Sequence, residues 1–133
     1  MKPSRPRIDP KQFELALKRS KLSEEELAMI EFIRYMGVFN ELSLRHGLSL
    51  PSKPPAVYVL GKLCKKIGLI LPDLYQQMMS WSTEQSPDRI AWDANLVCSI
   101  AYTCDGERLE PESATALYHT FTVHKELFNG LGE

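Results

Sequence analysis

Helical periodicity is the feature that most constrains the fold of this chain. Apolar residues recur three and four positions apart through most of its 133 residues, and no segment alternates apolar and polar residues for long enough to indicate a strand. Asp9-Pro10 and Ser86-Pro87 each place a capping side chain before a proline, which is a typical helix start. We therefore predict an all-α fold with about six helices, in a single domain over residues 9–133 that follows a flexible basic arm over residues 1–8.

The predicted central element is one long helix that begins after Ser23 and ends near His46. Ser23 and Glu26 form a capping-box pattern at its start, and Gly47 follows as its stop. Its apolar residues occupy nearly every face, which is typical of a helix that is covered on several sides. Shorter helices are expected over 9–19, over 86–104 and over 112–128, with a helical hairpin over 56–81.

The segment Ala56–Trp81 has the pattern of a helix-turn-helix. Cys64 is small enough for a close helix crossing, and Gly68, four positions later, can adopt the positive φ that ends the first helix. The second helix is expected to start near Pro72. Four apolar residues are expected to hold the two helices together: Leu63, Ile67, Leu69 and Leu74.

This motif predicts a set of residues that contact DNA. Its second helix would offer amide and hydroxyl groups to the bases, and its first helix and the N-terminal arm would offer cations to the phosphates. Asp73 and the lack of Lys or Arg in the second helix argue against this interpretation, and an ordinary helical hairpin with solvated lysines is the alternative. The predicted contacts are Gln76, Gln77 and Ser80 for bases, and Lys62, Lys65, Lys66, Lys2, Arg5 and Arg7 for phosphates.

The net charge of −1 conceals strong segregation along the chain. Residues 1–21 carry +5 and residues 22–41 carry −4, whereas residues 42–72 carry five basic side chains and no acidic one. Residues 84–133 carry −6. A segregated chain of this kind can present a positive surface to phosphate or an acidic one to a basic partner.

The three cysteines indicate a reducing compartment. Cys64, Cys98 and Cys104 are odd in number, include no C-x-x-C pair, and fall in apolar patterns, so we expect buried thiols and no disulfide framework. The chain has no signal-peptide pattern and no apolar run long enough to span a bilayer. We expect a cytoplasmic protein without a membrane partner.

The sequence contains no pattern that indicates catalysis, a metal site or a cofactor. His119 and His124 are five positions apart, which places them on different sides of a helix. No G-x-S-x-G or phosphate-binding glycine loop occurs. Glu31 and Glu41 are interpreted as the solvated edge of the long helix and not as an acid–base pair. We expect a protein that is not an enzyme.

Two functional interpretations remain open at this point. The first is a small regulator of transcription that binds duplex DNA as a homodimer, because dimers match two half-sites. The second is a helical protein–protein interaction module, such as an adaptor or an inhibitor. In that case the acidic C-terminal half would bind a basic or nucleic-acid-binding partner.

Overall fold

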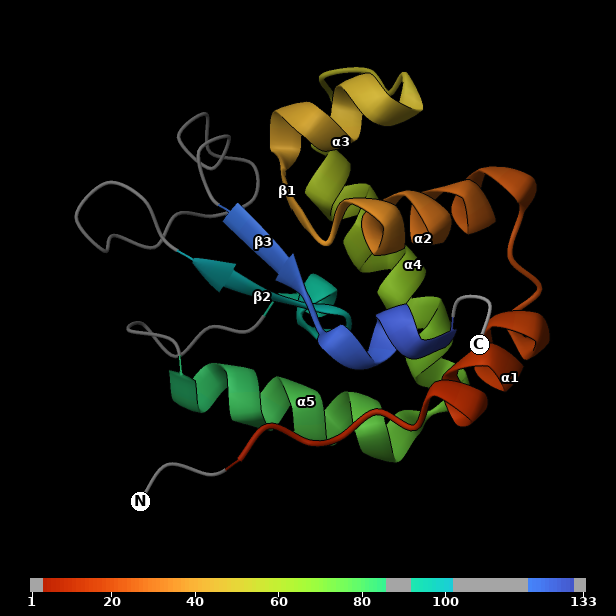
Figure 1. The fold of residues 1–133 in the computed structure, drawn as a ribbon, viewed down its shortest axis with the longest axis vertical. Coiled ribbons are helices and arrows are strands. Elements are labelled where there is room, and N and C mark those ends of the chain that lie inside the picture. The colour runs from red at the N-terminus through yellow and green to blue at the C-terminus, as the bar shows by residue number, and fades with distance from the viewer. Residues whose placement is uncertain (1–3, 86–91, 102–119, 131–133) are drawn as a thin grey trace.

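The computed structural model describes residues 4–85, 92–101 and 120–130 of the chain. These residues form five α-helices, two short 3-10 helices and one three-stranded sheet (Figure 1). The domain is mainly helical, as predicted, but the sheet departs from the all-α prediction. None of the helices in these three ranges is long and apolar enough to cross a membrane.

The first two helices start where the local sequence signals predict. Helix α1 (Pro10–Arg19) begins after Asp9, whose side chain accepts a hydrogen bond from the Lys11 N–H at 3.0 Å. Helix α2 (Glu24–Met36) begins with the complete capping box of Ser23 and Glu26. These caps satisfy N–H groups that the first turn of a helix leaves unpaired.

The predicted long helix is wrong, because the chain breaks at Gly37. Gly37 has a φ of +70°, and a Cβ atom there would lie 3.0 Å from Cζ of Phe128. Strand β1 (Val38–Asn40) follows, and Asn40 then caps helix α3 (Glu41–Leu48) by accepting a hydrogen bond from the Ser43 N–H at 2.9 Å. A glycine that costs helix propensity is favoured here because only it tolerates this backbone conformation next to an aromatic ring.

The sheet forms where two further helices were predicted. Strands β2 (Cys98–Ala101) and β3 (Thr120–Val123) join β1 in the order β1-β3-β2, with both pairs antiparallel and Phe121 opposite Phe39 and Ile100. The 3-10 helices η1 (Asp93–Leu96) and η3 (Lys125–Gly130) flank these strands. The helix predictions over 86–104 and 112–128 are therefore wrong for the described parts, and residues 86–91 and 102–119 lie outside the described residues.

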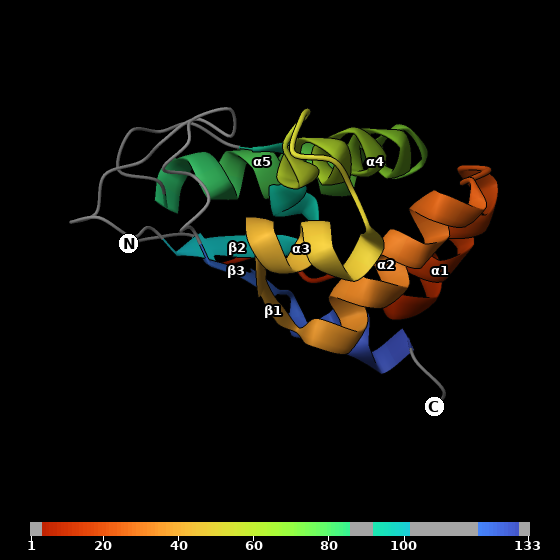
Figure 2. The same ribbon diagram turned by 90° about the horizontal axis from the view of Figure 1, so that it is seen from above.

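The core lies between the sheet and the two longest helices. Helices α4 (Ala56–Ile70) and α5 (Pro72–Gln85) form a layer on one side of the sheet, with η1 between them and the strands (Figure 2). The rings of Phe39 and Phe121 stack at 5.3 Å between centroids, and Leu60 and Leu96 are fully buried nearby in the same core. Burying each such side chain contributes about 1.5 to 3 kcal/mol of stability.

Candidate nucleic-acid interface

A buried carboxylate joins α3 to the beginning of α4. Glu41 is only 2% exposed, and its two oxygens accept hydrogen bonds from the N–H groups of Ala56 at 2.6 Å and Val57 at 2.9 Å. The guanidinium of Arg45 lies 2.7 Å from the same carboxylate. Helix α4 has Pro55 as its N-cap and no cap from its own sequence, so Glu41 supplies both the acceptors and the negative charge that this helix end favours.

The prediction that Glu41 lies on a solvated helix edge is therefore wrong. The sequence reasoning missed its role because the break at Gly37 moves Glu41 from the end of an assumed long helix to the first turn of α3. The two prolines before Ala56 were the available signal, since a helix that starts after Pro54-Pro55 lacks its own capping side chain.

The exposed side of α4 carries cations and no acid. Tyr58, Lys62, Lys65 and Lys66 are exposed, at spacings that place them along one side of the helix. The Lys62 ammonium lies 5.1 Å from the centre of the Tyr58 ring, which is within the range of a cation–π contact.

Two of these lysines are close to acids of other elements. Lys66 Nζ lies 2.9 Å from Glu26 Oε1 in α2, and Lys65 Nζ lies 3.9 Å from Asp93 Oδ2 in η1. Both lysines are more than half exposed, so these pairs are in contact with solvent and each stabilises the fold by roughly 1 kcal/mol or less. The lysines can therefore exchange these partners for other anions at small cost.

The acid-free segment of the sequence coincides with this helix pair. Residues 42–72 cover all of α3 after Glu41, the connector 49–55 and all of α4, and they contain five basic residues and no acidic one. Arg45 is tied to Glu41, whereas Lys53 is exposed in the connector. Most of the positive charge of this segment is thus carried by the three lysines of α4, whose beginning Glu41 holds against α3.

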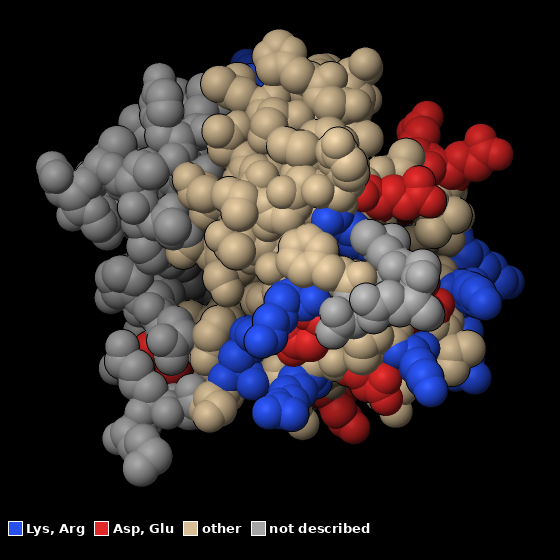
Figure 3. Space-filling view, in the orientation of Figure 1, with Lys and Arg blue, Asp and Glu red and all other residues tan. Residues whose placement is uncertain are grey.

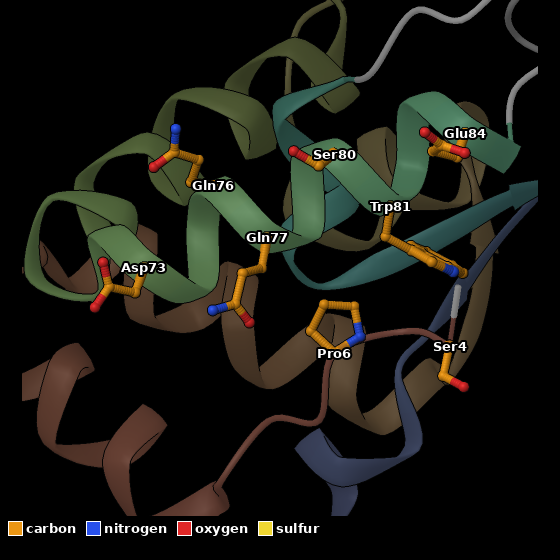
Figure 4. Close-up of a pocket in the computed structure, with 8 residues that line it drawn as sticks. All are labelled: Ser4, Pro6, Asp73, Gln76, Gln77, Ser80, Trp81 and Glu84. Atoms are coloured by element: carbon orange, nitrogen blue, oxygen red, sulfur yellow. The ribbon is translucent and has the colours of Figure 1, made fainter. Parts of the chain in front are cut away.

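The predicted base-contacting residues line a groove beside α5. Gln76, Gln77 and Ser80 of α5 line a cavity of about 780 Å³ together with Ser4 and Pro6 of the N-terminal segment. Figure 4 shows that Gln77 extends towards Pro6, whereas Gln76 and Ser80 point away from it. Asp73 and Glu84 stand at the two ends of the same stretch of helix. The structure therefore brings the three predicted polar residues together, but it places them between two acids.

The turn between α4 and α5 differs from the prediction. Helix α4 continues through Gly68 to Ile70, and only Leu71 separates it from α5, which starts at the predicted Pro72. Gly68 is needed for close packing, because a Cβ atom there would lie 2.6 Å from Cδ2 of Tyr75. Leu69, which was predicted to hold the two helices together, is 81% exposed, whereas Leu63 and Ile67 are buried as predicted.

The N-terminal segment lies along α5 (Figure 1). Arg5 forms an ion pair of 2.6 Å with Glu126, and the Ile8 N–H donates to the other oxygen of that carboxylate at 3.2 Å. Burial raises the pKa of Glu126, but hydrogen bonds from Arg5 and from backbone N–H groups outweigh it and lower the pKa to about 2. Arg7 is exposed, and Lys2 lies outside the described residues.

Basic side chains also gather elsewhere on the surface. Figure 3 shows cations around the N-terminal segment and α1, with acidic side chains interspersed among them. Mixed charges of this kind give a weak field for phosphate. Helix α4 differs from α1, α2 and α3 in carrying no acid of its own, although Glu26 and Asp93 of other elements pair with two of its lysines.

Two thiols and one imidazole are buried in the part of the interior that the structure describes. Cys64 and Cys98 are buried free thiols, as predicted, and burial raises the pKa of both, while Cys104 lies outside the described residues. His124 donates its Nε2–H to the Asn95 carbonyl at 3.0 Å, and burial lowers its pKa to about 4. No group of three or more metal-ligating side chains occurs within the ranges that the structure describes.

Comparison with known proteins adds no assignment to this geometry. No protein-family model, no curated protein and no solved structure matches the chain.

Proposed function

We propose that this protein binds duplex DNA as a regulator of transcription, with α4 as the contacting helix, supported by α3 and not by the α4–α5 pair over 56–81 that the sequence predicted as a helix-turn-helix. Helix α4 approaches the duplex in this proposal, and α3 lies across its beginning. The single observation that carries the proposal is the match between the acid-free segment 42–72 and two helices locked by Glu41. The proposal is of a binding protein and not of an enzyme.

The exposed side of α4 has the chemistry for this role. Lys62, Lys65 and Lys66 can neutralise phosphates, which supplies most of the affinity of non-specific DNA binding. Tyr58, one turn before Lys62, adds a side chain that can donate a hydrogen bond and stack. A homodimer fits the proposal, because two copies present two such helices to successive half-sites.

Helix α5 is the less suitable helix for contact with DNA. Gln76 and Gln77 can in principle hydrogen-bond with adenine edges, but Asp73 and Glu84 would bring negative charge towards phosphates at both ends. Residues 4 and 6 also lie along the groove that these amides line. In our proposal the N-terminal segment assists through the exposed Arg7, beside the duplex.

The experiment is a titration of a labelled random duplex by fluorescence anisotropy at several salt concentrations. The wild-type protein is expected to bind at low salt and to weaken steeply as salt rises. The double variant Lys62→Ala with Lys65→Ala should lose affinity and reduce the slope of log affinity against log salt by about 2. Both side chains are exposed, so the variant is expected to stay folded.

A charge-matched control separates this surface from general basicity. Lys11→Ala with Lys18→Ala removes the same charge from exposed positions of α1 and should change the affinity much less. Gln76→Ala with Gln77→Ala tests α5 in the same assay. The proposal fails if the wild type does not bind at low salt, or if the α1 or α5 variant weakens binding more than the α4 variant does.

One observation favours a second candidate function, a protein–protein interaction module. Four large apolar side chains are exposed around the end of α2, β1 and the first turn of α3: Tyr35 at 86%, Met36 at 40%, Val38 at 51% and Leu42 at 40%. Figure 3 shows a nearly uncharged surface over α3, β1 and β3. A neutral apolar face of this kind is typical of a contact with another protein chain. Light scattering of wild type and Val38→Glu would reveal whether that chain is a second copy.

A further inference from the structure

A second cavity lies between α2, the end of α3 and α4. It has a volume of about 400 Å³, and its lining includes the apolar side chains of Met29, Leu48, Leu50, Val59 and Leu63. Met29 and Leu63 are buried and belong to the core, whereas the other three are partly exposed. A cavity of this size with a mainly apolar lining and a few polar groups is typical of a small-molecule site.

The wall formed by the end of α3 is fixed by backbone hydrogen bonds. Ser49 ends the helix in the left-handed conformation with a φ of +54°, and the Leu50 N–H donates to the Arg45 carbonyl at 2.9 Å. This arrangement holds the Leu50 side chain against the core cluster. The cavity is therefore formed before any ligand enters, which lowers the entropy cost of binding.

The polar side chains of the cavity lining are two carboxylates, Glu25 and Glu26, and the hydroxyl of Ser49. Glu25 and Glu26 of α2 line the cavity, and Glu24 precedes them in the same exposed turn. Glu26 bonds with the Ser23 N–H and with Lys66, whereas Glu25 is exposed and has no hydrogen-bond or ion-pair partner among the residues that the structure describes. Because Lys66 pairs with Glu26, the carboxylate of Glu25 is the unpaired charge of the cavity lining, and it complements a cation.

We propose that this cavity binds a small organic cation that combines an apolar body with a primary ammonium group. The body occupies the space between Met29, Leu50 and Val59, and the ammonium group faces the free carboxylate of Glu25. The assignment does not depend on DNA binding, because it rests on the shape and charge of the cavity alone.

The test is an NMR titration of the isotopically labelled full chain with 2-phenylethylamine as the probe. Saturable shifts are expected at the amides of Ser49, Leu50 and Val59, with a Kd on the order of 1 mM. Two probes with the same ring, 2-phenylethanol and 3-phenylpropanoate, should bind several times more weakly. No DNA is present, so failure here is distinct from failure of the proposed function.

Three variants distinguish binding in this cavity from non-specific attraction of cations to carboxylates elsewhere on the protein. Glu25→Gln should weaken the amine by about threefold and leave the alcohol unchanged. Glu84→Gln removes the same charge from α5 and should change the affinity for neither the amine nor the alcohol. Val59→Phe fills the cavity and should weaken all three probes by at least tenfold. If that variant does not fold, the comparison of Glu25→Gln with Glu84→Gln decides. Equal binding of the three probes, shifts confined to the α5 groove, or an equal effect of both glutamate variants would overturn the proposal.

Discussion

Helix α4 takes part in two helix pairs that are built in different ways. With α3 it forms a pair across a seven-residue connector, and the buried Glu41 carboxylate fixes the junction. With α5 it forms a pair across the single residue Leu71, and the Tyr75 ring packs on Gly68. The first pair is held by a polar lock, namely the hydrogen bonds and the ion pair of the buried Glu41, and two of its exposed lysines pair with the acids Glu26 and Asp93. The second pair is held by packing and has the acids Asp73 and Glu84 along its groove. The helix pair with the longer connector is thus the one that has a buried ion pair at its junction.

The largest expected effect comes from breaking the polar lock. Glu41→Ala leaves two N–H groups and the Arg45 guanidinium without their acceptor, and we expect it to lower the free energy of unfolding by about 3 to 5 kcal/mol. Urea denaturation measures this loss. Glu31→Ala, at an exposed position of α2, is the control and should change stability by less than about 0.5 kcal/mol. Equal effects of the two substitutions would show that Glu41 does not lock the pair.

A smaller loss of stability is expected at acidic pH, because His124 packs on the side of α5 that faces the sheet. The His124 ring lies edge-on to Trp81 of α5 at 6.3 Å, and burial lowers its pKa from 6.5 to about 4. Between these pH values the unfolded chain binds a proton that the folded chain does not, so stability falls as pH falls, by up to about 3 kcal/mol.

Urea denaturation between pH 7 and pH 4 checks this dependence. His124→Gln retains a donor for the Asn95 carbonyl but does not titrate, so the part of the slope due to His124 should disappear. Glu126 acts in the same direction but at lower pH. Because its pKa is lowered, its carboxylate stabilises the fold above pH 4.5, and this stabilisation is lost as the pH falls towards 2. An unchanged slope in the variant between pH 6.5 and pH 4 would contradict the assignment to His124.

The smallest expected loss of stability comes from adding a methyl group at Gly68, where α4 packs on Tyr75 of α5. Gly68→Ala gains helix propensity, but its Cβ would lie 2.6 Å from the Tyr75 ring, so we expect a net loss of about 1 to 2 kcal/mol. Gly61→Ala is the matched control in the same helix, because its Cβ would lie at an ordinary 3.4 Å from Asp93. The control should be neutral or stabilising. A stabilising Gly68→Ala would show that Tyr75 moves aside and that close packing does not hold this pair.

The sequence predicted features that depend on neighbouring residues and missed those that depend on distant ones. Asp9, the Ser23 capping box and Pro72 each act within one turn of helix, and the structure confirms all three starts. The strands were interpreted as helices because a run such as Phe121–Val123 is too short for its period to be read, and its partner Phe39 lies about 80 residues earlier.

The candidate interface was predicted in part for the same reason. The lysines of α4 and the lack of acids in the neighbouring sequence are local properties, and Lys62, Lys65 and Lys66 were identified from them. The acids Glu26 and Asp93, which pair with two of these lysines, come from distant parts of the sequence. The partner helix was not, because the positive φ of Gly37 depends on packing against Phe128 and hides α3 inside an apparently continuous helix. Glu41 was therefore predicted to be exposed, whereas it is buried.

The strand order has a consequence for the order in which the chain is made. The central strand β3 is the last of the three in the sequence, so β1 has no partner until about 80 further residues have left the ribosome. At roughly 5 to 20 residues per second this takes several seconds. The bonds between Glu41 and Ala56 span only 15 residues and can form long before that. During synthesis the α3–α4 pair is therefore expected to assemble first, and the sheet forms only after β3 has emerged.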